Sequence, residues 1–334
     1  MTFESQNSNN NEFYPNNKII EYCNTIIDYS QKKYPRYDLS HFAGYFTDDE
    51  IEQDNNRIEH IKNNFLKKNS SLGLENQKII DYSKMKGEAL EVIIADQIEN
   101  SDWFGDESLF FRTTEYDDFI NGVDAVVEFN IEESNHPERI SLSIDSTSCT
   151  GSEIIKNKID RNISKILNNK LEVKYYESPV LDADQAYTGS LKDIVPVVIG
   201  LESSNTSHLV ASFSRFIQLE SLVNDTKLSN NLRVTYRKEF NSLRREIEKD
   251  PCQLVFLKEI KYQLEMYSRI LTKENNPNIN VKVSDVNKIT KIINNILEEK
   301  NEIEKSFEVS ILRKNDAVYN LIGYHCNSRT VTSN

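Results

Sequence analysis

The chain has 334 residues, a formal net charge of −13 and 38% hydrophobic residues. This length and apolar content are sufficient for a sizeable core, and they indicate one main domain with a smaller appended region. The acidic balance argues against a protein that coats nucleic acid indiscriminately, because such binding needs many Lys and Arg residues to displace counterions from phosphates.

Membrane and extracellular classes are also disfavoured by the sequence. No stretch approaches the roughly 18 consecutive apolar residues that a membrane-spanning helix needs. The first residues lack the basic and apolar regions of a signal peptide, so we expect a cytoplasmic protein without a membrane partner. The cysteines show no C-x-x-C pair and no zinc spacing with histidine, so neither a disulfide framework nor a zinc site is indicated: Cys23, Cys149, Cys252 and Cys326.

Changes in composition and periodicity divide the chain into consecutive parts. They are a disordered Asn-rich tail at 1–17, an N-terminal helical segment at 18–75, a core of mixed helices and strands at 76–225 and a helical C-terminal region at 226–334. The N-terminal segment contains predicted helices at 19–29 and 47–66. The second of these begins with Thr47-Asp-Asp-Glu50, a capping-box pattern.

Within the core, hydrophobic periodicity predicts helices that alternate with short strands. The helices are expected at 78–98, 150–167 and 207–223, and the strands at 109–112, 122–130, 139–147, 171–177 and 194–202. The last strand is almost continuously apolar, which is typical of a strand buried on both faces. The helix at 207–223 is expected to cover the sheet.

Long charged helices are predicted in the C-terminal region at 234–249, 252–272 and 284–307. An isoleucine stripe on the last of them could pack on the protein's own core or bind a protein partner or a second copy: Ile289, Ile292, Ile293, Ile296 and Ile303. The pair Tyr175 and Tyr176 fits sheet packing, with base stacking as an alternative.

Carboxylates between residues 88 and 145 carry the strongest chemical signal. Glu88 and Glu91 share one face of a predicted helix, and Asp124 and Asp145 lie on successive predicted strands. Acids on adjacent strands repel one another unless a cation or a proton lies between them, and oxygen ligands favour Mg²⁺ or Mn²⁺. The alternative for each acid is an ordinary solvated residue in a turn or on a helix surface.

The order of these residues resembles the PD-(D/E)XK nuclease superfamily over residues 80–220. The matching features are Glu91 on a helix, Gly122-Val-Asp124 on a strand, Ile144-Asp-Ser-Thr147 on the next strand and then a basic helix. The resemblance implies an α/β (α+β) restriction-endonuclease-like fold, in which helices flank a central mixed sheet, here with a C-terminal helical appendage. It also implies a metal site of Glu91, Asp124 and Asp145 that holds Mg²⁺ or Mn²⁺, with Gly87 allowing the helix to approach the sheet closely.

The resemblance further implies a metal-dependent endonuclease or phosphodiesterase that hydrolyses nucleic acid, with DNA as the expected substrate. The family's strand lysine is replaced here by Thr147. The catalytic lysine is therefore expected on the following helix, at Lys156 or Lys158, which lie on opposite flanks of its apolar stripe. Glu88, Asp118 and Thr147 are secondary candidates. The alternative function is a catalytically silent nuclease-like module that binds nucleic acid or protein.

Overall fold

The N-terminal segment begins earlier than its periodicity indicates. The computed structural model describes residues 15–106, 108–131, 138–168, 170–179, 187–192, 194–273 and 277–331. Residues 1–14 of the expected tail lie outside the described residues. The last residue of that expected tail, Asn17, is already helical. Helix α1 (Asn17–Lys33) is capped by the side chain of Asn16, which accepts the Lys18 N–H at 3.0 Å. Helix α2 (Asp48–Ser70) begins with the expected capping box between Thr47 and Glu50.

The central sheet has four strands in the order β1-β2-β3-β6. Strands β1 (Ser108–Arg112), β2 (Ala125–Ile131) and β3 (Glu138–Thr147) form an antiparallel meander, and β6 (Val195–Gly200) runs parallel to β3. Every residue of β6 is buried, as its continuous apolar sequence predicts. The mixed α/β class expected from the sequence is therefore confirmed.

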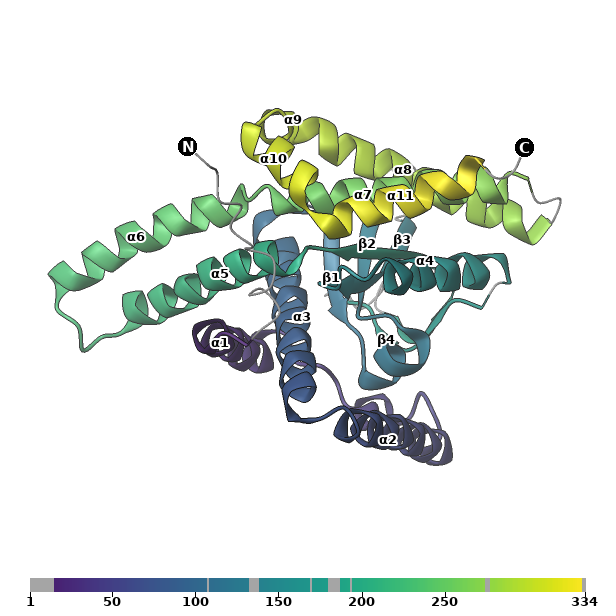
Figure 1. Ribbon diagram of the computed structural model, residues 1–334, viewed down its shortest axis with the longest axis horizontal. Coiled ribbons are helices and arrows are strands. Elements are labelled where there is room, and N and C mark those ends of the chain that lie inside the picture. Colours follow the sequence, from purple (N-terminus) through teal and green to yellow (C-terminus); the bar gives the residue numbers. More distant parts are fainter. Residues whose placement is uncertain are drawn as a thin grey trace, which may run out of the picture.

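Helices pack on this sheet from several parts of the chain (Figure 1). Helix α3 (Leu74–Ser101) contacts β1 and β3, and α4 (Ser152–Leu167) contacts β6. The expectation for the helix after β6 is wrong, because α5 (Ser203–Asn224) packs mainly on α1, α3 and α6 (Asn230–Glu248). Figure 1 shows α5 and α6 as two long, neighbouring helices that extend away from the sheet.

Helix α7 (Cys252–Leu271) closes the edge of the sheet instead. Strand β6 is an edge strand, and an exposed edge offers unpaired backbone groups to other chains. Gln263 of α7 accepts the Val198 N–H and donates to the Val198 carbonyl, and Glu259 accepts the Gly200 N–H at 2.9 Å. The C-terminal region is helical as expected, but α7 is an integral part of the core.

The remaining C-terminal helices join the same core. They are α8 (Pro277–Glu299), α9 (Asn301–Glu304), α10 (Phe307–Asn315) and α11 (Ala317–Val331). Of the isoleucine stripe, Ile289, Ile293 and Ile296 of α8 lie in the main hydrophobic cluster, and Ile292 of α8 and Ile303 of α9 are partly buried against it, so the stripe packs within the chain. None of the described helices is long and apolar enough to cross a membrane.

A second small sheet lies next to the segment that joins β1 to β2. It consists of β4 (Glu172–Glu177) and β5 (Thr188–Lys192), and the sequence predicted only the first of these strands. Tyr175 and Tyr176 are fully buried, which confirms their packing role over base stacking. The short 3₁₀ helix η1 (Leu39–Phe42) packs in the same hydrophobic cluster as these two tyrosines. A turn of π-helix, η2 (Asp117–Asn121), joins β1 to β2 and lies next to β4.

Candidate active site

One cavity of about 760 Å³ lies at the end of the central sheet and is lined by charged side chains. Its acids are Glu88, Glu91, Glu115, Asp118, Asp124 and Asp145, and its bases are Arg36, Lys84, Arg112, Lys158 and Arg161. Helix α3, strands β1 and β3, the segment before β2 and helix α4 all contribute to it. The structure therefore brings Glu88, Glu91, Asp118, Asp124, Asp145 and Lys158 together, as the sequence predicts.

The backbone before β2 fixes the position of Asp124. The π-helical turn ends at Gly122, whose φ of +59° favours glycine, and a Cβ there would lie 2.5 Å from Nη1 of Arg161. Two residues later, the Asp124 N–H donates to the Ile144 carbonyl at 2.8 Å, while its own carbonyl accepts the Thr113 N–H at 3.1 Å. Asp124 is therefore held on both sides within the sheet.

Asp117 fixes the same turn from the other direction. Its carboxylate accepts the backbone N–H groups of Lys174 at 2.7 Å and Tyr175 at 3.0 Å, and the side-chain amide of Asn121 at 2.7 Å. Asp117 thereby ties η2 to β4, and its neighbour Asp118 is presented to the cavity. The role of Asp117 is therefore structural.

The Asp124 carboxylate is buried without a cationic partner. Its Oδ2 accepts the Ser146 N–H at 2.6 Å and the Ser146 hydroxyl at 2.9 Å, and the residue is 8% exposed. Asp124 forms no ion pair with any residue that the structure describes. Burial, followed by the charges of Glu91 and Asp145, raises the pKa of Asp124 well above its usual value.

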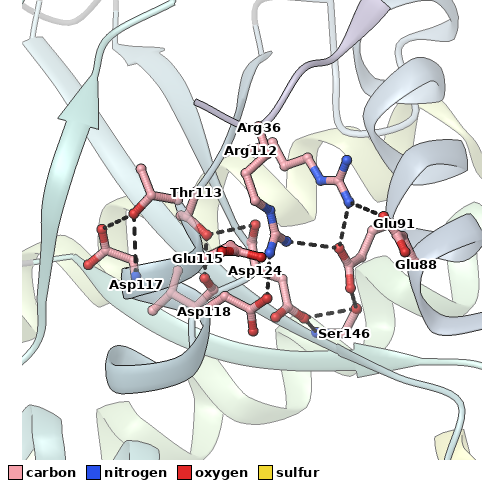
Figure 2. A network of polar contacts seen from close by, with 12 residues as sticks. Arg36, Glu88, Glu91, Arg112, Thr113, Glu115, Asp117, Asp118, Asp124 and Ser146 are labelled. Atoms are coloured by element: carbon pink, nitrogen blue, oxygen red, sulfur yellow. Dashed lines mark hydrogen bonds and ion pairs between the residues drawn. The ribbon is translucent and has the colours of Figure 1, made fainter. Parts of the chain in front are cut away.

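Two arginines surround Glu91, as Figure 2 shows. Arg36 Nη2 lies 3.6 Å and Arg112 Nη2 lies 3.7 Å from Glu91 Oε2. Arg36 also binds Asp118 at 2.7 Å, and Arg112 binds Glu88 at 3.2 Å. Burial raises the pKa of Glu91 to about 7, although the charges of Arg36 and Arg112 oppose the rise. Glu88 and Asp118 share these arginines with Glu91, and their own charges also raise its pKa.

Asp145 is neutralised by cations from helix α4. Lys158 Nζ lies 2.5 Å from Asp145 Oδ1 and donates to the Ser146 carbonyl at 3.0 Å, while Arg161 binds the other carboxylate oxygen. Burial lowers the pKa of Lys158, but the charges of Asp145 and Asp124 outweigh this effect and leave it above its ordinary value. Lys158 therefore stays charged at neutral pH.

The structure distinguishes the two candidate lysines. Lys156 forms an ion pair at 3.0 Å with Asp160 and does not line the cavity, so the geometry favours Lys158 of the two alternatives. A lysine two residues further along α4 points to a different side of the helix, which explains the separation. Thr147 lines the cavity, but its hydroxyl accepts the Cys149 N–H at 3.2 Å and does not contact the acids.

Sequence reasoning missed Arg36, Arg112, Ser146 and Arg161. Arg161 lies three residues after Lys158 and could have been found from helical spacing. Ser146 follows Asp145 directly in β3, and neighbouring strand residues point to opposite faces, yet Ser146 binds Asp124 through both its backbone and its hydroxyl. Arg36 follows the first helix and shows no local sign of reaching the site.

The oxygen donors of this cavity suit a hard divalent cation. Asp124 is a buried carboxylate that forms no ion pair with a described residue, and the charges of Glu91 and Asp145 raise its pKa while the more weakly acting charge of Lys158 lowers it. In the described part of the chain, no three His, Cys, Asp or Glu side chains are grouped closely enough to form a metal site. Asp145 is not free to join such a group, because Lys158 and Arg161 hold both of its carboxylate oxygens.

The raised pKa of Glu91 predicts a pH-dependent stability. An acid whose pKa rises on folding stabilises the folded state below its unfolded value and loses that contribution as pH rises toward its folded value. In EDTA, Glu91→Gln should therefore gain stability relative to the native chain as pH rises from 4.5 to about 7. Urea denaturation across this range measures the difference, and a constant or shrinking advantage of the variant would contradict the assignment.

Comparison of the chain with protein-family models, with curated proteins and with solved structures found no match.

Proposed function

We propose that this protein is a Mg²⁺- or Mn²⁺-dependent nuclease with a variant PD-(D/E)XK site, and that it hydrolyses phosphodiester bonds in nucleic acid, with DNA as the first substrate to test. The observation that carries the proposal is the buried Asp124 carboxylate, which has no cationic partner among the described residues and lies in one cavity with Glu91, Asp145 and Lys158.

The order of elements supports this proposal. Helix α3 is followed by the antiparallel strands β1 to β3, then by α4, and finally by β6 parallel to β3. The same order is what the superfamily resemblance implies. The chain departs from it by inserting β4 and β5 between α4 and β6. These strands form their own sheet and leave the four-stranded order intact.

Glu91, Asp124 and Asp145 would hold the metal ion. When bound, the ion would orient and acidify a water molecule and stabilise the added charge on the phosphate. Lys158 supplies a positive charge beside Asp145 that the missing strand lysine would otherwise provide, and it would stabilise negative charge on the phosphate oxygens. Arg36 and Arg112 oppose the rise in the Glu91 pKa, and so favour its ionised form.

Metal binding should stabilise the folded chain. A ligand that binds only the folded state raises the melting temperature as its concentration exceeds the dissociation constant. Mg²⁺ or Mn²⁺ should therefore raise Tm for the native protein and have little effect on Asp124→Asn, with sodium chloride at equal ionic strength as the control. Equal increases in Tm for both proteins would show that Asp124 does not bind the metal ion.

The activity itself is tested by a panel of substrates. The purified chain is incubated with labelled single-stranded and double-stranded DNA and RNA in Mg²⁺, Mn²⁺ or EDTA. We expect cleavage of at least one substrate with metal and none with EDTA. An absence of cleavage throughout, by protein whose folding is verified by circular dichroism, would favour the silent nuclease-like module.

A further inference from the structure

An aromatic pair lines the same cavity as the carboxylates. Phe65 comes from α2 and Phe119 from η2, and both line the cavity that contains Asp124 and Asp145. Their ring centroids are 6.4 Å apart, and the residues are 47% and 37% exposed. The two rings therefore offer accessible aromatic surface at a site that also holds cations suited to phosphate.

A lysine lies beside this pair. Lys84 Nζ is 5.8 Å from the centroid of the Phe65 ring, and Lys84 is exposed. It forms no ion pair with any described residue, unlike Arg36, Arg112, Lys158 and Arg161 in the same cavity. An aromatic surface next to an available cation matches a nucleotide, because each nucleotide has a flat base and a negative phosphate.

One face of α3 connects the aromatic pair to the carboxylates. Ile80, Lys84, Gly87 and Glu91 follow the helical spacing of three or four residues, and all four line the cavity. Lys84 and Glu91 are seven residues apart, which corresponds to about 10 Å along the helix axis.

Gly87 keeps the middle of this face open. The sequence suggested that Gly87 allows a close approach of α3 to the sheet, but that expectation is wrong. A Cβ built on Gly87 would meet no described side chain, and no described backbone outside its own helical turns, within 4 Å. Glycine is unfavourable inside a helix, and here it leaves free space where a ligand backbone could approach.

We propose that this face of α3 binds a single-stranded segment of nucleic acid, DNA or RNA, with an unpaired base on Phe65 and Phe119 and its backbone passing Gly87 toward the carboxylates. The inference rests on the proposed function, since it names the substrate class of the same site. Bases inside a duplex are stacked on one another and do not present their faces to a protein side chain. The nuclease is therefore specific for single strands or for unpaired ends.

Binding is tested with a single-stranded oligonucleotide that carries 2-aminopurine, a base whose fluorescence falls when it stacks. DNA and RNA versions and the matching duplexes are titrated in Ca²⁺, with the strand checked for cleavage by gel. Phe65→Ala and Phe119→Ala should each weaken single-strand binding roughly 5- to 150-fold. Phe307→Ala is the matched control, because Phe307 is 74% exposed on α10 and does not line the cavity.

Gly87→Leu tests whether the nucleic-acid backbone passes Gly87 between the aromatic pair and the carboxylates. Leucine has the better helix propensity, so Tm should not fall, but its side chain would occupy the free space beside Gly87. Oligonucleotide binding and cleavage should therefore be lost in a variant that is as stable as the native chain. Gly87→Ala, which adds a single methyl group, should retain most oligonucleotide binding.

The outcomes separate this inference from the nuclease assignment. Unchanged single-strand binding by both phenylalanine variants, or tighter binding of duplex than of single strand, would overturn the single-strand site even if the native chain cleaves DNA. Binding that depends on Phe65 and Phe119, together with no cleavage in any metal, would support the single-strand site and refute the nuclease activity.

Discussion

Replacing Lys158 with methionine should lower kcat for phosphodiester cleavage about 10²–10³-fold, the usual effect of losing one electrostatic contact to the transition state. Methionine keeps an aliphatic chain of similar length and removes the charge. Lys158 Nζ lies 2.5 Å from Asp145 and is the lysine of α4 that lines the cavity. KM should change much less than kcat, since the charge acts mainly when negative charge builds on the phosphate.

Lys156→Met is the matched control for this experiment. Lys156 lies on the same helix and forms an exposed ion pair with Asp160, so its loss should change kcat by less than about twofold. Equal rates for the native chain and Lys158→Met would show that α4 does not supply the missing lysine. Arg161, which also binds Asp145, would then be the next residue to change.

Asn substitutions of Asp124 and Asp145 should both abolish metal-dependent cleavage, yet they should change stability in opposite directions. Asp124 is buried near Glu91 and Asp145 and forms no ion pair with a described residue, so Asp124→Asn removes charge repulsion while Oδ1 can still accept from Ser146. Asp145→Asn instead leaves Lys158 and Arg161 without their carboxylate. We expect a higher Tm for Asp124→Asn and a lower Tm for Asp145→Asn in EDTA.

The sign of the Asp124 effect follows from its pKa. Because folding raises the pKa of Asp124, the native chain loses stability as pH rises above the ordinary value of this group. The Tm advantage of Asp124→Asn should therefore be small at acidic pH and larger at neutral pH. A lower Tm for both variants at neutral pH would mean that groups other than these contacts stabilise the Asp124 charge.

Local patterns in the sequence were sufficient for most of the core elements. The acids Asp124 and Asp145 could be assigned to adjacent strands because Asp124 begins one short β-rich run and Asp145 lies near the end of the next, and the buried strand at 195–200 is evident from its continuous apolar residues. The choice between Lys156 and Lys158 required the structure. Both lie beside the apolar stripe of α4, and periodicity does not tell which side faces Asp145.

Residues that reach the site from distant positions could not be predicted from the sequence. Arg36 lies 82 residues before its partner Asp118, and no local pattern connects them. The closure of the β6 edge by Gln263 likewise depends on where α7 packs. Such contacts arise from tertiary packing between segments, whereas periodicity reports only which face of each segment is apolar.

The central claim is that Glu91, Asp124 and Asp145 form a divalent-metal site. A crystal structure with Mn²⁺, using the anomalous signal of the ion, tests it most directly. The account predicts a Mn²⁺ ion bound by oxygens of Asp124 and Asp145, with Glu91 binding directly or through water and Lys158 Nζ nearby. A structure at saturating Mn²⁺ with no ion at these acids, and with Lys158 and Arg161 still bound to both oxygens of Asp145, would contradict it.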